Sequence, residues 1–361
     1  MLASLLKNKP RTVLGVDISP SSIKIVELSQ SGNGYKLESI GLARLPDKSV
    51  IDNIIQLPSA VGESVEKALK LSGSRLKQAA VAVSGSTVIT KIIQMDATLS
   101  EKEMESQIAV EADQYIPYSL DEVAIDFEVQ HLNKKNPEQA EVLVAACKQE
   151  NIELREESLE IGGLNTAIVD VEVFAIERAY RLVHSQLTSK PDSSMIAVVD
   201  IGSQSTALHV FSQQQDEKNS EIIYTREEPL GSQQLTDEIQ HTYDMPAEDA
   251  EKAKKNGQLP EDYHDRLLLP FTESLAQQIS RSLQFFYSSV NVSSIDGIIL
   301  CGGGALLTPL TEQASQLLNI PIVKANPFHN MALSRKINAH SLEQEAPLFM
   351  TACGLAMRSF N

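Results

Sequence analysis

A duplicated hairpin pattern constrains the fold of this 361-residue chain more than any other sequence feature. Residues 12–28 and residues 196–211 each hold a β-rich run ending in an aspartate, a short turn of small polar residues, and a second β-rich run. Another run with strand character follows each copy, at 35–44 and at 221–226. Two similar meanders in one chain predict two similar subdomains that face each other across a cleft.

The turns of these hairpins have the composition of phosphate-binding loops. Small residues expose successive backbone N–H groups to phosphate oxygens, and an aspartate at a strand end can hold magnesium through water. The predicted magnesium ligands are Asp17 and Asp200. An ordinary hairpin with a turn aspartate is the alternative for either copy alone, and the duplication argues against it. The other predicted nucleotide-binding residues of the hairpins are Ser19, Ser21, Ser22 and Lys24 in the first copy, and Gly202, Ser203, Gln204 and Ser205 in the second.

A third feature is the apolar run 297–301, which leads into Gly302, Gly303 and Gly304 and then into a helical pattern. Glycine lets the backbone approach a flat base or sugar closely, and a helix N-terminus adds positive potential. Three glycines alone are weak evidence for a nucleotide-binding turn. After two phosphate hairpins, they predict a turn that contacts the nucleoside.

Charge and residue usage exclude several function classes. The net charge of −17 repels nucleic acid phosphates, so we expect no nucleic acid partner. The three cysteines, Cys147, Cys301 and Cys353, stand far apart without Cys-x-x-Cys spacing, which argues against a disulfide framework or a zinc site. No apolar run approaches about 18 residues, and no P-loop motif occurs. We therefore expect a cytoplasmic protein without direct membrane insertion.

The order hairpin, hairpin, strand–glycines–helix is that of the actin, heat-shock chaperone and sugar kinase superfamily, and within it the sequence resembles the PilM family. Residues 115–118, Tyr-Ile-Pro-Tyr, resemble the Tyr-Ile-Pro-Phe element of that family, and the stretches 126–129, 279–286 and 352–358 also match. The resemblance implies an α/β, actin-like (ribonuclease H-like, duplicated) two-lobe fold with an inserted small α/β domain of the FtsA type. It also implies ATP and magnesium as cofactors.

The first hairpin departs from the family pattern. PilM proteins usually have Asp-Ile-Gly there, and this chain has Asp17, Ile18, Ser19 and Pro20. Replacing glycine by serine, followed by proline, removes one backbone donor and restricts the turn. We expect weaker or differently shaped phosphate binding from this side, which affects hydrolysis more than binding.

The resemblance assigns roles to three further residues. In the element at 250–254, Glu251 would contact ribose hydroxyls and Lys254 would lie near the adenine edge, with a solvated charged helix face as the alternative. Glu172, at the start of the connecting helix, would orient the attacking water as the catalytic residue. A capping carboxylate is the equal alternative for Glu172.

Resemblance and element pattern together divide the chain into four parts. Within the insertion, 81–84 is expected as a strand. The expected ranges are 11–80 with 169–194 for the first actin-like subdomain, 81–168 for the inserted interaction domain, 195–230 with 293–361 for the second actin-like subdomain, and 231–292 for its helical subdomain.

By resemblance, the chain is an ATP-binding adaptor of type IV pilus biogenesis, peripheral to the inner membrane. Its implied partner is the N-terminal cytoplasmic peptide of PilN, docked in a groove involving the inserted domain, with indirect links to PilO, PilP and the pilus motor ATPases. Any ATP hydrolysis is expected to be slow. Two alternatives stay open: a small-molecule kinase of the same superfamily, and an FtsA-like membrane tether of cell division. Self-association, and whether the pili serve motility, DNA uptake or adhesion, are left open as well.

Overall fold

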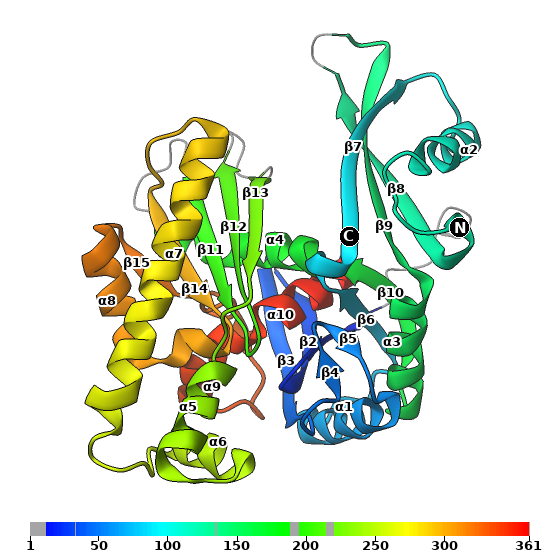
Figure 1. Cartoon of the computed structure of the whole chain (residues 1–361). Helices are drawn as coiled ribbons and strands as arrows, with labels where there is room; N and C mark the ends of the chain where they lie inside the picture. Colours follow the sequence, from blue (N-terminus) through cyan, green and yellow to red (C-terminus); the bar gives the residue numbers. More distant parts are fainter. Residues whose placement is uncertain (1–11, 33, 134–135, 188–194, 214–219, 361) are drawn as a thin grey trace.

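The computed structural model describes residues 12–32, 34–133, 136–187, 195–213 and 220–360. Figure 1 shows two lobes side by side, with a third, smaller unit rising from the first lobe. Within the described residues, no helix is both long enough and apolar enough to cross a membrane.

The first lobe is built on a mixed sheet. Among the described residues it has six strands in the order β10-β6-β1-β2-β3-β16. The strands are β1 (Leu14–Ser19), β2 (Ser22–Ser31), β3 (Gly34–Arg44), β6 (Gln78–Val83), β10 (Asn165–Val171) and β16 (Ala332–Leu333). The meander β1-β2-β3 is antiparallel, and β6 and β10 add in parallel on the other side of β1. Residues on both faces of β1 are buried, as in a sheet covered on both sides.

Helices cover both faces of this sheet. One face carries α1 (Pro58–Ser72) and α3 (Gln149–Ile161), and the other carries α4 (Glu172–Val183) and α10 (Met350–Ala356). Helix α10 approaches β1 so closely that a Cβ on Gly15 would collide with the carbonyl oxygen of Ala352. In the sequence, the small hairpin of β4 (Val50–Ile51) and β5 (Ile54–Ile55) connects β3 to α1.

The second lobe repeats the antiparallel meander. Its described strands run in the order β13-β12-β11-β14-β15. These are β11 (Met195–Ile201), β12 (Thr206–Gln213), β13 (Ser220–Glu228), β14 (Gly297–Cys301) and β15 (Ile322–Lys324). One face packs against α5 (Gln233–Tyr243), α6 (Ala247–Asn256), α7 (Leu269–Val290) and α8 (Thr308–Leu318). The opposite face packs against α4, which therefore lies between the two sheets.

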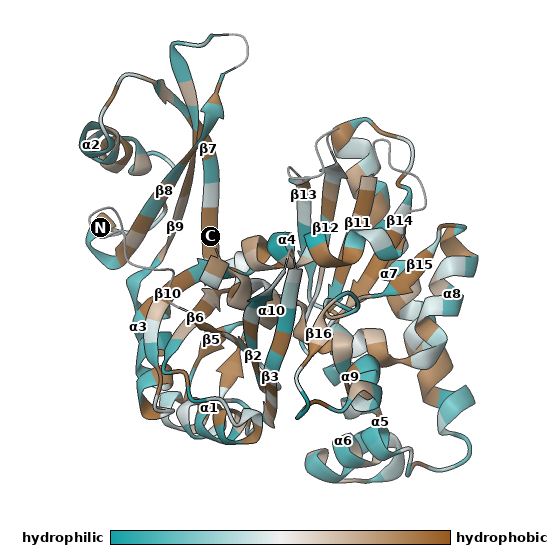
Figure 2. Cartoon of the chain, turned by 180° about the vertical axis from the view of Figure 1, so that it is seen from behind, coloured by the Kyte–Doolittle hydropathy of each residue, from teal (hydrophilic) through white to brown (hydrophobic). Residues whose placement is uncertain are grey.

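The smaller unit is a sheet of β7 (Val88–Asp96), β9 (Gln139–Lys148) and β8 (Val123–Leu132), in that order. Helix α2 (Glu101–Ala112) covers one face through Met104 and Ile108, which pack on Met95 and Val142. Figure 2, seen from behind, shows brown apolar residues along the strands of the two larger sheets and a mostly teal α3 on the surface.

The domain ranges expected from the sequence differ from this arrangement at two points. Strand β6, expected within the insertion at 81–84, belongs to the first-lobe sheet, because its backbone pairs with β1 and β10; α3 packs on this lobe as well. The C-terminal segment, expected in the second lobe, returns to the first, where β16 pairs with β3 and α10 packs on β1 and α4. Within the expected ranges, residues 11, 33, 134–135, 188–194, 214–219 and 361 lie outside the described part of the chain.

Candidate functional site

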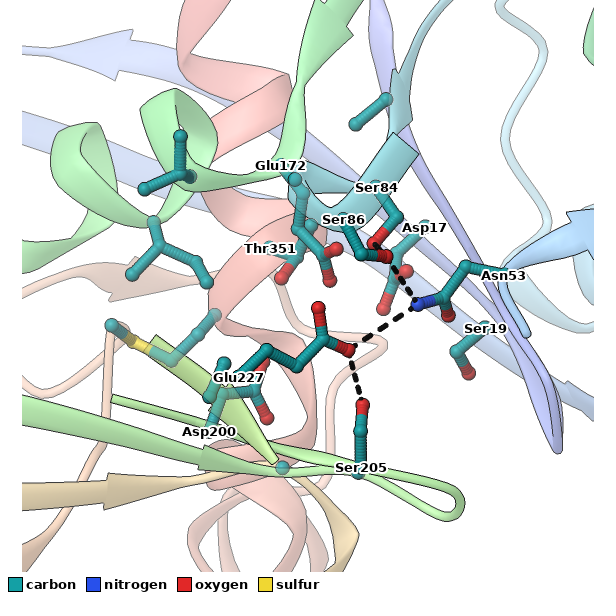
Figure 3. Close-up of a pocket in the computed structure, with 18 of the residues that line it drawn as sticks. Asp17, Ser19, Asn53, Ser84, Ser86, Glu172, Asp200, Ser205, Glu227 and Thr351 are labelled. Carbon is teal, nitrogen blue, oxygen red and sulfur yellow. Dashed lines mark hydrogen bonds between the residues drawn. The ribbon is translucent and has the colours of Figure 1, made fainter. Parts of the chain in front are cut away.

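A cavity of ≈ 390 Å³ lies between the two lobes. Both hairpin turns line it, together with Gly302 and Gly303 after β14, while Gly304 does not. This volume is in the range of small-molecule sites. Figure 3 shows Asp17, Glu172, Asp200 and Glu227 converging on it from different elements. Of the predicted hairpin residues, all those named from the sequence belong to the lining, namely Asp17, Ser19, Ser21, Ser22, Lys24, Asp200, Gly202, Ser203, Gln204 and Ser205.

The first hairpin holds its aspartate in an ion pair. Asp17 and Lys24 are direct partners in the β1–β2 register, and Lys24 Nζ lies 2.8 Å from Asp17 Oδ2. Both residues are buried, at 8% and 7% exposure. Lys24 also donates to Ser19 Oγ at 2.9 Å, and that hydroxyl donates to the carbonyl of Ser22. Asp17, predicted as a magnesium ligand, is therefore already neutralised by a cation of its own hairpin.

The second hairpin has a wider turn. Ile201 pairs with Thr206, so the residues 202–205 form the loop, which the Gly202 N–H closes on the carbonyl of Ser205 at 2.9 Å. The buried hydroxyl of Ser203 has no hydrogen-bond partner within the described residues. Such an unpaired polar atom beside consecutive backbone amides suits an anionic ligand.

Gly302 brings the third turn against the second hairpin. Its φ of +78° lies in the left-handed region, and a Cβ there would collide with Asp200 Oδ1 and the carbonyl of Ile201. Glycine is required at this position for both reasons. The contact places the end of β14 directly beside the carboxylate of Asp200.

Burial and neighbouring negative charges raise the pKa of two carboxyl groups of the cavity. Burial, followed by the charge of Asp17, raises the pKa of Asp200 to about 6. Burial, followed by the charges of Asp200, Asp17 and Glu227, raises the pKa of Glu172 to about 8, against a smaller opposing hydrogen bond from Ser84. Mutual repulsion of this kind favours a bound cation and is common at functional sites.

Glu172 is the first residue of α4, and Val171 is the N-cap residue, without any side-chain cap. Glu172 lies in the first helical turn, where a carboxylate suits the helix N-terminus, and it also lines the cavity. The capping role and the water-orienting role therefore both stay predictions.

Glu251 and Lys254, predicted from the family element, do not line this cavity. They form their own cluster on α6, where Lys254 Nζ lies 2.6 Å from Glu251 Oε2 and 2.6 Å from the hydroxyl of Thr236. Arg44 of the first lobe lies 3.7 Å from Glu251 Oε1. The charged-face alternative does not describe Lys254 well, because only 14% of its side chain is exposed.

Sequence reasoning missed three charged residues of the cavity, Arg155, Arg226 and Glu227. Arg155 of α3 is 2% exposed and donates to the carbonyls of Ala82, Asn151 and Asn53 at 2.7, 2.8 and 3.1 Å. Burial lowers its pKa to about 10, against the opposing charge of Glu172. Glu227 of β13 accepts a hydrogen bond from Ser205 Oγ at 2.5 Å. None of the three stands in a recognisable motif, since Arg155 is embedded in an acidic helix, and Arg226 and Glu227 in a strand with charged neighbours.

These residues fit a nucleotide with a magnesium ion. The second turn offers amides and a free hydroxyl, and the enclosed carboxylates offer negative charge to a cation. Within the described residues, no three or more His, Cys, Asp and Glu side chains are arranged as a complete metal site. A magnesium ion here would take most of its ligands from water and phosphate oxygens, as is usual for this ion.

Comparison with known proteins identifies the family. The model described as type IV pilus assembly protein PilM matches residues 15–360. The solved PilM–PilN type IV pilus biogenesis complex is similar at 28% identity and a TM-score of 0.79, covering 98% of this chain and 99% of that chain. The ethanolamine utilization protein EutJ from Carboxydothermus hydrogenoformans is similar at 18% identity and a TM-score of 0.54, covering 98% and 92%, which shows a shared fold alone.

The mixed α/β, actin-like fold expected from the hairpins is confirmed by these matches. The expected PilM resemblance is confirmed as well, because the match runs over nearly the whole chain. The chain belongs to the type IV pilus assembly protein PilM family.

Proposed function

We propose that this chain is a nucleotide-binding adaptor of the type IV pilus machine, which docks the N-terminal cytoplasmic peptide of PilN and so works beside the inner membrane. The observation that carries the proposal is the likeness to the PilM–PilN complex, at 28% identity over 98% of the chain. The family match favours this function over the kinase and the cell-division tether. Links to PilO, PilP and the motor ATPases would follow through PilN.

The β7-β9-β8 sheet with α2 is the proposed peptide-binding unit and the counterpart of the inserted FtsA-type domain. Strands β7 and β8 are its edges, so each has backbone groups available to an added strand. Apolar side chains accompany these edges: Ile92 on β7 is 56% exposed, and Val129 and Leu132 on β8 are 47% and 56% exposed. Exposed apolar residues beside a free edge suit an extended peptide with alternating apolar side chains.

The inter-lobe cavity is the proposed site for ATP and magnesium. Asp200 and the 202–205 turn would hold the phosphates and the ion, and the glycine turn after β14 would lie beside the nucleoside. Glu172 is the proposed positioning group for an attacking water. Its pKa of about 8 keeps much of it protonated at neutral pH, which agrees with slow hydrolysis because an orienting carboxylate must accept a hydrogen bond from that water.

The test is a titration of the purified protein with a synthetic peptide of the PilN cytoplasmic N-terminus, with and without magnesium and ATP. Saturable binding that falls at least tenfold in an Ile92→Asp variant supports the adaptor. Val110→Asp on α2 is the matched control, because Val110 is 73% exposed but lies on the helix rather than on a strand edge. Absence of peptide binding in both nucleotide conditions would refute the proposal.

A further inference from the structure

The second phosphate turn is tied to the opposite lobe through its own side chains. Gln204 Oε1 accepts the backbone N–H of Asp52 at 3.1 Å, and Gln204 Nε2 donates to the carbonyl of Val50 at 3.4 Å. The neighbouring Ser205 donates to Glu227 at 2.5 Å, and the same Glu227 oxygen lies 3.5 Å from Asn53 Nδ2. Figure 3 shows the chain of contacts from Ser205 through Glu227 to Asn53. We call these contacts, made by residues 50–53, 204, 205 and 227, the clasp.

The first-lobe side of the clasp is a rigid tip. Asp52 and Asn53 both have left-handed φ values, 49° and 62°, which form the two-residue turn that β-hairpins favour. Below the tip, Val50 and Ile55 are paired and buried at 2% and 3% exposure. Arg155 holds the carbonyl of Asn53 at 3.1 Å. The hairpin therefore presents its donors to the second lobe at a defined position.

Glu227 lies beside the second turn, which is the proposed phosphate site. It pairs with Ala207 in the β12–β13 register, just beyond the 202–205 turn, and its carboxylate accepts a hydrogen bond from the hydroxyl of Ser205. A phosphate oxygen would seek the same hydroxyl and the adjacent amides, since carboxylate and phosphate oxygens are alike as acceptors. Both groups are anions and repel each other unless a cation lies between them. Because Glu227 is an exposed residue, water and salt screen part of that repulsion.

We propose that the carboxylate of Glu227 competes with nucleotide phosphates for the second turn, so that the cleft selects the magnesium-complexed nucleotide and loosens the clasp when it binds. This inference rests on the proposed nucleotide function. Metal-free ATP meets the negative charge of Glu227 with all of its phosphate charges, whereas magnesium cancels much of the phosphate charge. Phosphate that takes over Ser205 also removes the partner that holds Glu227 toward Asn53.

The first experiment compares Glu227→Gln with the matched control Glu228→Gln. The two residues are neighbours on β13 and the substitutions remove the same charge. Glu228 itself is not part of the cavity lining, and its charge is paired at 2.5 Å with Arg226, which does line the cavity. Dissociation constants are measured for ATP with Mg²⁺ and for ATP with EDTA. We expect Glu227→Gln to bind metal-free ATP about tenfold more tightly and magnesium-ATP about two- to threefold more tightly than wild type. Glu228→Gln should stay within about twofold.

The second experiment tests, without nucleotide, whether the clasp holds the two lobes together. Spin labels at Lys70 of α1 and Leu317 of α8, both exposed, report the distance between the lobes by pulsed electron paramagnetic resonance. Gln204→Ala should shift the distance distribution to longer values. Gln56→Ala removes a side chain that donates a hydrogen bond to the carbonyl of Ile54 in its own lobe, and it should leave the distribution unchanged.

The outcomes distinguish a failure of the proposed competition or clasp from a failure of the proposed nucleotide function. If wild type binds ATP and Glu227→Gln binds no better than Glu228→Gln in either condition, the competition is refuted while the nucleotide function stands. If Gln204→Ala opens the lobes but neither wild type nor Glu227→Gln binds ATP, the nucleotide function is refuted and only the clasp remains. An unchanged distance distribution in Gln204→Ala refutes the clasp itself.

Discussion

The two hairpins that line the cavity share a sequence pattern, but they differ in turn length and in the charge environment of their aspartate. In the first, Ser19 pairs with Ser22 across a two-residue turn, and Asp17 is neutralised by Lys24 at 2.8 Å. In the second, the turn is the wider loop 202–205, and burial raises the pKa of Asp200 to about 6. The carboxylate of Asp17 is already paired with a buried ammonium group, so it attracts a magnesium ion only weakly. The carboxylate of Asp200 can bind the ion more strongly.

This difference refines the sequence-based expectation about Ser19. The substitution of glycine was expected to weaken phosphate binding through the backbone. In the structure, Ser19 has an ordinary negative φ, and its hydroxyl receives a hydrogen bond from Lys24. The first hairpin thus stabilises the cleft through an internal ion pair, and the second offers the free carboxylate. Four measurements test this division of roles, beginning with the largest expected effect.

Asp17→Ala should destabilise the protein by about 3 kcal/mol, because it leaves the buried ammonium of Lys24 without its partner. Urea unfolding measures the loss. The double variant Asp17→Asn with Lys24→Met carries no buried charge and should recover most of the stability. Equal stability of Asp17→Ala and wild type would show that the ion pair contributes nothing, and the comparison with Asp200 would fail.

Asp200→Ala should weaken magnesium-ATP binding about 100-fold, and Asp17→Ala only about tenfold, because Asp200, unlike Asp17, has no ion-pair partner among the described residues. Isothermal titration calorimetry gives both affinities. Asp296→Ala is the control, since Asp296 caps the opposite end of the same sheet by accepting the N–H of Met195. A larger loss in Asp17→Ala than in Asp200→Ala would reverse the assignment of roles.

Glu172→Gln should make the protein more stable at alkaline pH, by on the order of 2 kcal/mol at pH 8.5. The pKa of Glu172 is raised from 4.5 to about 8, so the folded state holds its proton more tightly than the unfolded state. The contribution of the Glu172 carboxyl group to the free energy of unfolding is fully present below pH 4.5. It is lost as the pH rises through 8.

The glutamine variant lacks this titration, so its advantage over wild type should grow across the same window. Thermal unfolding from pH 4 to 9 measures it, with Glu153→Gln on the exposed face of α3 as the control. A difference that does not depend on pH would contradict the raised pKa.

Ser19→Gly should have the smallest effect. The loss of the hydrogen bond from Lys24 should cost less than about 1 kcal/mol of stability. We expect less than a threefold change in nucleotide affinity, because the geometry of the turn does not need glycine. Urea unfolding and nucleotide titration measure the two quantities. An affinity gain of tenfold or more would instead assign the asymmetry of the hairpins to this residue.

The local sequence pattern was sufficient to predict the strands and turns whose backbone forms the site. The expected strand at 35–44 is β3, and the apolar run before Gly302 is β14. Runs of β-branched residues, small turn residues and glycines act within a few positions of the chain, so their conformations can be predicted without knowing the fold. The superfamily resemblance could be read from the same stretches, and the PilM resemblance from residues 115–118, 126–129, 279–286 and 352–358.

Other features depend on partners far apart in the sequence. Strand β6 and helix α10 could be assigned to the first lobe only from their pairing and packing with β1. Arg155 lies 102 residues from Asn53, and Gln204 lies 152 residues from Asp52. No local pattern encodes such contacts.

The sequence by itself determined two similar hairpins and a glycine turn, because these rest on short-range conformational preferences. The resemblance of its motifs also determined membership of the PilM family. Only the tertiary structure decided which aspartate keeps a free carboxylate and that Glu227 and the β4–β5 tip meet at the second turn. The physical reason is that charge pairing and hydrogen bonding across a cleft depend on where the packed lobes place each side chain, and packing sums contacts over the whole chain.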